Sequence, residues 1–139
     1  MTNKVNKLLI NSKNTFFSVN LRDFSSEDSC LNYIAEKLNN GGDIIEIRTE
    51  NIDTRNLINT GKKLRELTGV FEALLVIYDR IDIAQVINAD GITLDKNSMS
   101  IAETNNLCEN KKIIGCYTNV QQTDGADFLI TENLKILKW

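Results

Sequence analysis

The chain has 139 residues, a net charge of −3 and 42% hydrophobic residues, which are ordinary values for one globular domain. Its basic residues are scattered and form no stripe, so we do not expect nucleic-acid binding. The sequence contains no histidine, which excludes Ser-His-Asp and Cys-His catalysis.

The apolar segments and the cysteines indicate the cellular location of the protein. The longest apolar segment, 71–78, is far shorter than the roughly 20 residues that cross a bilayer. The apolar start, 8–10, is shorter than the core of a signal peptide, which needs about 7 residues. Cys30, Cys108 and Cys116 form no Cys-x-x-Cys pair, which favours reduced, buried thiols over a metal site. We therefore expect a cytoplasmic protein without a membrane span.

Apolar runs and helix signals alternate along the chain. The expected strands are rich in β-branched residues, and the expected helices begin at serine or aspartate caps and end near glycine. In chain order, we expect a strand at 16–19, a helix from Ser25 or Ser26 to Gly41-Gly42, a strand at 43–50, a helix from Asp53 to about Leu67 with Gly69 as its stop, a strand within 71–78, a short helix at 81–88, a strand at 91–94, a helix from Ser98 or Ser100, and strands at 112–117 and 126–130.

Three connecting segments are less regular. Segment 8–10 either pairs with the first strand as a hairpin or precedes it without regular structure. The connection 118–125 is shorter than the roughly 10–12 residues of a helical crossover, so we expect no full helix there. The tail, 131–139, is either a last strand or one helical turn.

Repeated strand-helix-strand units predict parallel strands joined by right-handed crossovers. The predicted fold class is therefore α/β. We expect a parallel (β/α) barrel-like fold, an incomplete TIM barrel with about six strands. Such a sheet has two open edges that must be covered, and pairing between copies in a homo-oligomer is one way to cover them.

Glu46 and Arg48 share one face of the strand 43–50, because side chains on a strand alternate. In a barrel that face points to the interior, near the end where ligands bind. In an edge strand the same face would be solvated. The sequence leaves both interpretations open.

A charged cluster follows the apolar segment 71–78. Ligands of parallel folds bind beyond the carboxyl ends of the strands, so Asp79 and Arg80 are the first candidates. Asp79 and Asp82 would equally serve as caps of the following helix, and Arg80 could pair with Asp82 or Glu46. Asp90 could simply serve the turn into the next strand.

Five segments together resemble one family. They are Ile45-Glu-Ile-Arg48, Ile77-Tyr-Asp-Arg-Ile-Asp-Ile-Ala84, Ala89-Asp-Gly-Ile-Thr-Leu94, Ile113-Ile-Gly115 and Ala126-Asp-Phe128. Their order and spacing resemble the thiamine phosphate synthase and TenI-like proteins, which are (β/α)8 barrels. The resemblance implies that residues 1–139 form a single domain of this family.

The resemblance also implies a chemistry. Thiamine phosphate synthase joins hydroxymethylpyrimidine pyrophosphate to a thiazole phosphate and releases pyrophosphate, with magnesium and basic groups stabilising the leaving group. Arg48 matches the pyrophosphate-binding arginine of the family, and Asp79 matches a magnesium ligand. Arg80, Asp95 and Thr118 are weaker candidates.

Several positions depart from the family pattern. Glu46 and Glu50 stand where the family has glutamine and lysine, and Tyr78 replaces an asparagine. Ser98 replaces a second magnesium carboxylate, for which the nearby Asp95 could substitute. Tyr117 replaces a serine, with Thr118 beside it, and the seventh and eighth strands of the family are not matched.

Three hypotheses follow from the resemblance and these departures. The protein is a divergent transferase of thiamine biosynthesis, a non-catalytic family member that binds a phosphorylated small molecule, or an oligomeric interaction module. The sequence does not decide whether the protein is an enzyme.

Overall fold

A computed structural model describes residues 14–137, so segment 8–10 lies outside the described residues. One sheet holds seven strands in chain order, β1 to β7. The strands are β1 (Phe16–Asn20), β2 (Ile44–Arg48), β3 (Leu74–Tyr78), β4 (Gly91–Leu94), β5 (Ile113–Tyr117), β6 (Phe128–Ile130) and β7 (Ile136–Leu137). β1 to β6 are parallel, and β7 runs antiparallel to β6.

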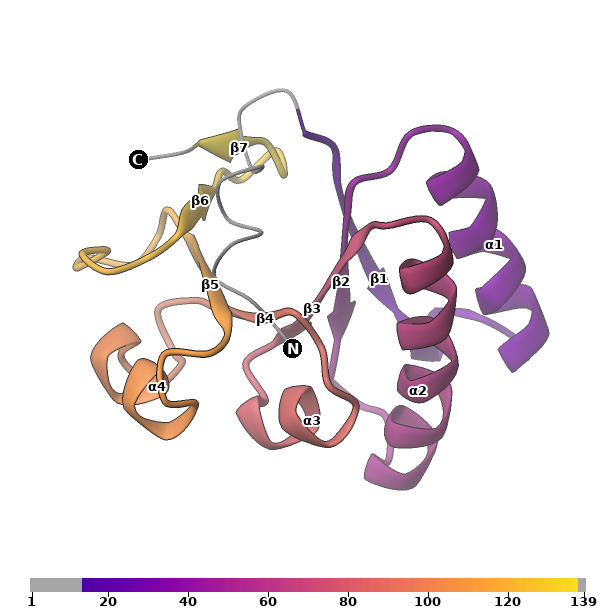
Figure 1. Ribbon diagram of the computed structural model, residues 1–139, viewed down its shortest axis with the longest axis horizontal. Coiled ribbons are helices and arrows are strands. Elements are labelled where there is room, and N and C mark those ends of the chain that lie inside the picture. The colour runs from indigo at the N-terminus through magenta and orange to yellow at the C-terminus, as the bar shows by residue number, and fades with distance from the viewer. Residues whose placement is uncertain (1–13, 138–139) are drawn as a thin grey trace.

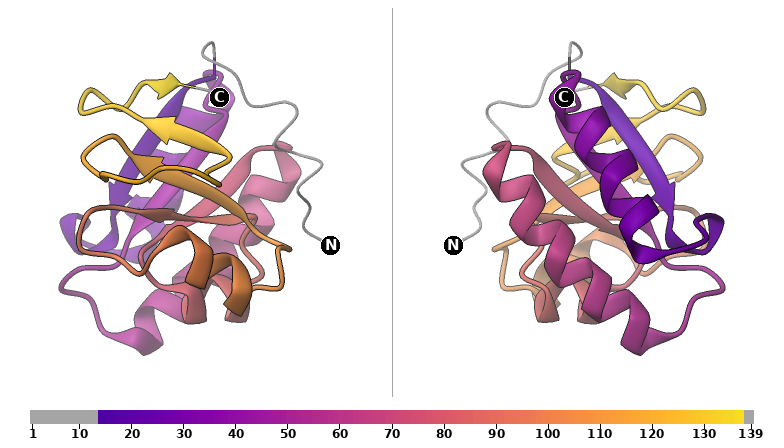
Figure 2. Two further views of the ribbon diagram at one scale, coloured as in Figure 1. Left: turned by 90° about the vertical axis from the view of Figure 1, so that its left-hand side faces the viewer. Right: turned by 90° about the vertical axis from the view of Figure 1, so that its right-hand side faces the viewer.

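Helices connect the first five strands. They are the 3₁₀ turn η2 (Leu21–Asp23), α1 (Glu27–Asn39), α2 (Thr54–Val70), α3 (Ile81–Val86) and α4 (Ile101–Leu107). Figure 1 shows α1 and α2 side by side, with α3 and α4 following along the sheet. The curl of the sheet is visible in the two side views of Figure 2. None of the described helices is long and apolar enough to cross a membrane.

The predicted incomplete barrel is confirmed, with six parallel strands and a short seventh. The tail forms a strand, β7, which resolves one ambiguity of the sequence. No helix lies between β5 and β6, as the short connection predicted. The predicted stop at Gly69 was wrong, because α2 continues to Val70 and ends with Phe71 as its C-cap. Glycine inside a helix lowers stability but does not by itself end the helix.

Side-chain caps begin α1, α2 and α4 where the sequence predicted them. The Ser26 hydroxyl accepts the N–H of Ser29, and the Ser29 hydroxyl accepts the N–H of Ser26. Asp53 caps α2, and Ser100 caps α4 through the N–H of Glu103. These bonds satisfy backbone donors that the first helical turn leaves unpaired.

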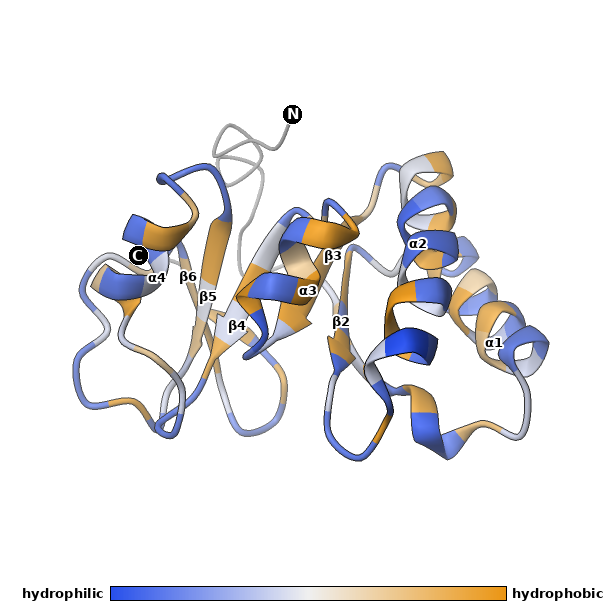
Figure 3. Ribbon diagram, turned by 90° about the horizontal axis from the view of Figure 1, so that it is seen from below, coloured by the Kyte–Doolittle hydropathy of each residue, from blue (hydrophilic) through white to orange (hydrophobic). Residues whose placement is uncertain are grey.

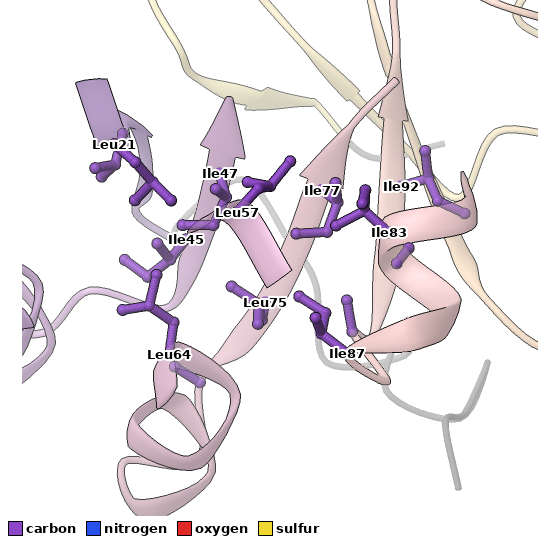
Figure 4. Packing of buried hydrophobic residues seen from close by; sticks show 14 of the residues in the cluster. Leu21, Ile45, Ile47, Leu57, Leu64, Leu75, Ile77, Ile83, Ile87 and Ile92 are labelled. Atoms are coloured by element: carbon purple, nitrogen blue, oxygen red, sulfur yellow. The ribbon is translucent and has the colours of Figure 1, made fainter. Parts of the chain in front are cut away.

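The two faces of the sheet bury separate hydrophobic clusters. The larger cluster packs the helices against one face, where Leu57, Leu64 and Ile83 contact the strand residues (Figure 4). The strands carry mostly hydrophobic residues, whereas the helices mix both classes (Figure 3). The smaller cluster lies on the opposite, concave face and contains no helical residue. This second cluster is the interior of the partial barrel, and it includes Phe16, Ile44, Val76, Ile113, Phe128, Ile130 and Ile136.

An aspartate clip recurs at the amino-terminal edge of the sheet. In each copy, an aspartate just before a strand donates its N–H to a carbonyl at the start of the preceding strand. Its carboxylate accepts the N–H of that same residue. The pairs are Asp43 with Thr15, Asp90 with Leu75 and Asp127 with Ile114, with N–H to carboxylate distances of 2.9, 2.8 and 2.8 Å. Asp90 therefore does more than serve a turn, because it also binds Arg65 at 2.7 Å.

We predict that Asp90→Ala lowers the free energy of unfolding by about 1–3 kcal/mol, because the buried N–H of Leu75 would lose its acceptor. Urea denaturation followed by circular dichroism measures the change. Asp124→Ala, at an exposed loop aspartate, is the matched control. Equal stability of the two variants would contradict the clip.

Candidate functional site

The carboxyl ends of neighbouring parallel strands bring the predicted site residues to one edge. Arg48 ends β2, Asp79 follows β3, Asp95 follows β4 and Thr118 follows β5. This is the edge at which parallel barrels bind ligands. The structure thus brings the candidate residues to one edge of the sheet, where each makes different contacts.

A buried carboxylate, that of Glu46, occupies the centre of the concave face below this edge. Glu46 is 0% exposed. It accepts hydrogen bonds from Ser18 Oγ at 2.6 Å, Thr93 Oγ1 at 2.5 Å and Tyr117 Oη at 2.8 Å. These donors come from β1, β4 and β5, so the face that Glu46 shares with Arg48 points into the barrel. The edge-strand interpretation is wrong.

The Arg48 guanidinium lies between two carboxylates and a ring. Its Nε and Nη2 bind the two oxygens of Glu50 at 3.0 and 2.6 Å, and Nη1 lies 3.7 Å from Glu46. Its central carbon lies 3.5 Å from the centre of the Tyr78 ring, a cation–π contact. Burial alone would lower the pKa of Arg48, but the Glu50 hydrogen bonds and the charge of Glu46 outweigh it and raise the pKa. Arg48 is therefore a permanent cation.

Asp95 joins this group through Tyr78. The Tyr78 hydroxyl donates to one oxygen of Asp95, while the other oxygen accepts the N–H of Asn97 at 2.9 Å and the hydroxyl of Ser98 at 3.2 Å. Burial alone would raise the pKa of Asp95, but these hydrogen bonds lower it on balance. Burial and the neighbouring Asp95 raise the pKa of Tyr78, which stays protonated as the donor. Asp95 thus already has partners at both oxygens.

Among the described residues, the Asp79 and Arg80 side chains form no hydrogen bond to this network, although the Asp79 N–H donates to the carbonyl of Thr93 at 2.8 Å. Asp79 is exposed and has a left-handed backbone conformation, with φ of 65°. Arg80, not Asp79, is the N-cap of α3 and makes no side-chain cap bond, so the capping interpretation of Asp79 was wrong. Asp82 does lie in the first turn of α3, where a carboxylate is favourable. Arg80 binds Asp82 at 2.9 and 2.8 Å, as one interpretation predicted.

Thr118 does not join the network either. Its side chain is exposed, and its backbone N–H donates to the carbonyl of Ile130 at 3.0 Å. That bond links β5 to β6. We therefore place Thr118 at the edge of the sheet without a contact to Arg48 or Asp79 in the described structure.

Within residues 14–137, no group of three or more acidic or thiol side chains is placed to hold a metal ion. Magnesium, however, is often held by one or two protein carboxylates together with phosphates of the substrate. The exposed Asp79 carboxylate fits that limited role. Asp95 fits it less well, because Tyr78 and Ser98 occupy its oxygens.

The three cysteines are free and buried, as predicted. Burial raises the pKa of Cys30 and of Cys116 to about 11, so both are protonated thiols at neutral pH. They contribute packing to the core and not a nucleophile.

Sequence reasoning missed the hydroxyl groups that hold Glu46. Ser18, Thr93 and Tyr117 each lie in an apolar strand, on the face that points into the barrel. Polar residues at every second position of buried strands are the signal that would have found them. Their shared partner could not be recognised, because the sequence does not give the distance between strands.

Comparison with known proteins identifies the family. A family model described as thiamine monophosphate synthase matches residues 19–133. The chain belongs to the thiamine phosphate synthase family. The predicted resemblance is thereby confirmed over most of the chain.

Individual relatives agree with this assignment. The chain is 32% identical over 119 residues to the thiamine-phosphate synthase of Methanococcus maripaludis strain C7, covering 82% of this chain and 56% of the relative. It is 33% identical over 114 residues to that of Clostridium novyi, covering 78% and 56%. The solved thiamine phosphate pyrophosphorylase from Pyrococcus furiosus superposes with a TM-score of 0.72 at 29% identity, covering 86% of this chain and 60% of that one. The chain thus spans a little over half the length of these relatives.

We predict that Tyr117→Phe lowers the free energy of unfolding by about 1–3 kcal/mol, because buried Glu46 would lose a hydrogen-bond donor. Thermal or urea unfolding measures the difference. Tyr33→Phe is the control, since Tyr33 is 42% exposed on α1. If both variants unfold alike, the Tyr117 hydroxyl does not support the network.

Proposed function

We propose that this protein acts in thiamine biosynthesis as a thiamine phosphate synthase-type transferase. In this proposal, hydroxymethylpyrimidine pyrophosphate and a thiazole phosphate bind at the carboxyl edge of the sheet and are joined with release of pyrophosphate. The observation that carries the proposal is Arg48, a permanent cation fixed at the end of β2 in a member of this family. A departing pyrophosphate requires such a cation where its charge develops.

The side chains of this chain would divide the work as follows. Arg48 binds the pyrophosphate group, and Glu46 with its hydroxyl partners fixes the position of Arg48. Asp79 holds magnesium, which when bound neutralises phosphate charge. Tyr78 supports Arg48 through its ring and excludes water from one face of the guanidinium.

The activity test supplies the native protein with both phosphorylated substrates and magnesium, and measures thiamine phosphate. We predict that Arg48→Ala and Asp79→Ala each reduce the rate by roughly 100-fold, the scale expected for loss of one stabilising group. Arg55→Ala, at an exposed arginine of α2, is the control and retains the native rate. No product from native protein at high concentration would exclude the synthase function.

A second candidate is a family member that binds a phosphorylated small molecule without catalysis. The observation that favours it is the engagement of Arg48 by both Glu50 and Glu46, which surrounds the cation with negative charge. Calorimetry with pyrophosphate separates the two candidates. Binding that is lost in Arg48→Ala, without any product formed by native protein, identifies the non-catalytic function.

If Arg48→Ala and Asp79→Ala both bind pyrophosphate as tightly as native protein does, neither candidate function can use these residues as its binding site. The cytoplasmic location and self-association through the sheet edges remain predictions of the sequence. Fractionation and light scattering test them, and a monomer at micromolar concentration would contradict self-association.

A further inference from the structure

We infer that Glu50 is an internal competitor for the phosphate-binding edge of Arg48, and thereby a specificity-determining residue. This inference rests on the proposed function, in which Arg48 binds pyrophosphate. The inference adds Glu50 to that site and requires the ligand to displace it. A bound anion has to displace Glu50, so the site favours multiply charged phosphate groups over singly charged anions.

The first observation is the geometry of the Arg48–Glu50 pair. Nε and Nη2 of Arg48 form two hydrogen bonds to the two oxygens of Glu50, at 3.0 and 2.6 Å. Two parallel N–H bonds of this kind are also the arrangement with which arginine binds phosphate. Glu50 therefore occupies the edge that a phosphate group would use.

The remaining surfaces of the guanidinium do not offer a second bidentate edge. Nη1 lies 3.7 Å from the buried carboxylate of Glu46, and the Tyr78 ring lies 3.5 Å from the central carbon. Glu46 is held by three hydroxyl groups and is 0% exposed. A ligand that binds Arg48 through Nε and Nη2 consequently has to replace Glu50.

Glu50 is also the partner that can leave. Its side chain is 43% exposed, against 0% for Glu46. It lies beyond the end of β2, and within the described residues it hydrogen-bonds no side chain other than Arg48. Release of Glu50 into solvent therefore leaves no buried group unpaired on this side chain, whereas movement of Glu46 would break its hydrogen bonds from three hydroxyl groups.

The charge balance sets the ligand class. Exposed ion pairs contribute little to stability, because water screens both charges. A carboxylate or another singly charged anion would gain no more from Arg48 than Glu50 already does. A pyrophosphate group carries more charge and more acceptor oxygens, so it gains enough to replace the glutamate.

The test titrates inorganic pyrophosphate, at fixed magnesium, into native protein and the Glu50→Gln variant by calorimetry. Glutamine keeps the size of the side chain and removes its charge, so we expect roughly twofold to fivefold tighter binding. Glu72→Gln, at an exposed glutamate before β3, is the matched control for the change in net charge. Acetate, a singly charged anion, is titrated in parallel, and we expect it to bind Glu50→Gln but not native protein.

Two further variants establish that the effect passes through Arg48. We expect Arg48→Ala and the double variant Arg48→Ala with Glu50→Gln to bind pyrophosphate equally weakly, because the competitor matters only when its target is present. Arg48→Lys keeps a positive charge beside buried Glu46 but lacks the two parallel N–H donors of the guanidinium. It replaces Arg48→Ala in this comparison if Arg48→Ala does not fold. Circular dichroism verifies the folding of each variant.

The outcomes distinguish this inference from the proposed function. If Arg48→Ala loses binding but Glu50→Gln binds no more tightly than Glu72→Gln, Glu50 is not a competitor and the proposed site stands. If Glu50→Gln tightens binding equally with and without Arg48, the effect is general repulsion and the inference is overturned. If Arg48→Ala and Glu50→Gln both bind pyrophosphate as tightly as native protein does, the inference and the pyrophosphate site both fail. The same conclusion follows if neither native protein nor Glu50→Gln binds pyrophosphate.

Discussion

The buried carboxylate of Glu46 is the constraint around which the concave face is organised. A charge removed from water costs several kcal/mol unless hydrogen bonds and an opposite charge replace the lost hydration. Hydroxyl groups from β1, β4 and β5 provide those bonds, and Arg48 provides the charge. Because four strands meet at one side chain, the position of Arg48 depends on the curvature of the whole sheet.

The opposite edge of the sheet is held by a different device. There the aspartate clips, such as the one between Asp90 and Leu75, fix the starts of neighbouring strands through backbone N–H groups. Two of these aspartates belong to the segments that carry the family resemblance, Ala89-Asp90 and Ala126-Asp127. Part of the family signature therefore maintains the fold, while the residues at the carboxyl edge determine the chemistry.

Much of the fold and part of the site could be predicted from the sequence. Periodicity and caps located the strands and helices, because these signals depend on residues close together in the chain. The family resemblance selected Arg48 and Asp79, with Asp95 as a weaker candidate, and the fold brings all three to one edge of the sheet. The sequence prediction failed at Gly69, which lies inside the last turn of α2, and in offering Asp79 as a cap of α3, whose N-cap is Arg80.

The sequence by itself determined the α/β class, the parallel strand order and the family, since these rest on local pattern and on residues in a fixed order. Only the tertiary structure decided what each charged residue touches. Glu46 and Tyr117 are 71 positions apart, yet they share a hydrogen bond, because the sheet curls until β2 and β5 face each other across the interior. That curvature, and with it the group of hydroxyl donors from three other strands around Glu46, is a property of the packed strands and of no single segment.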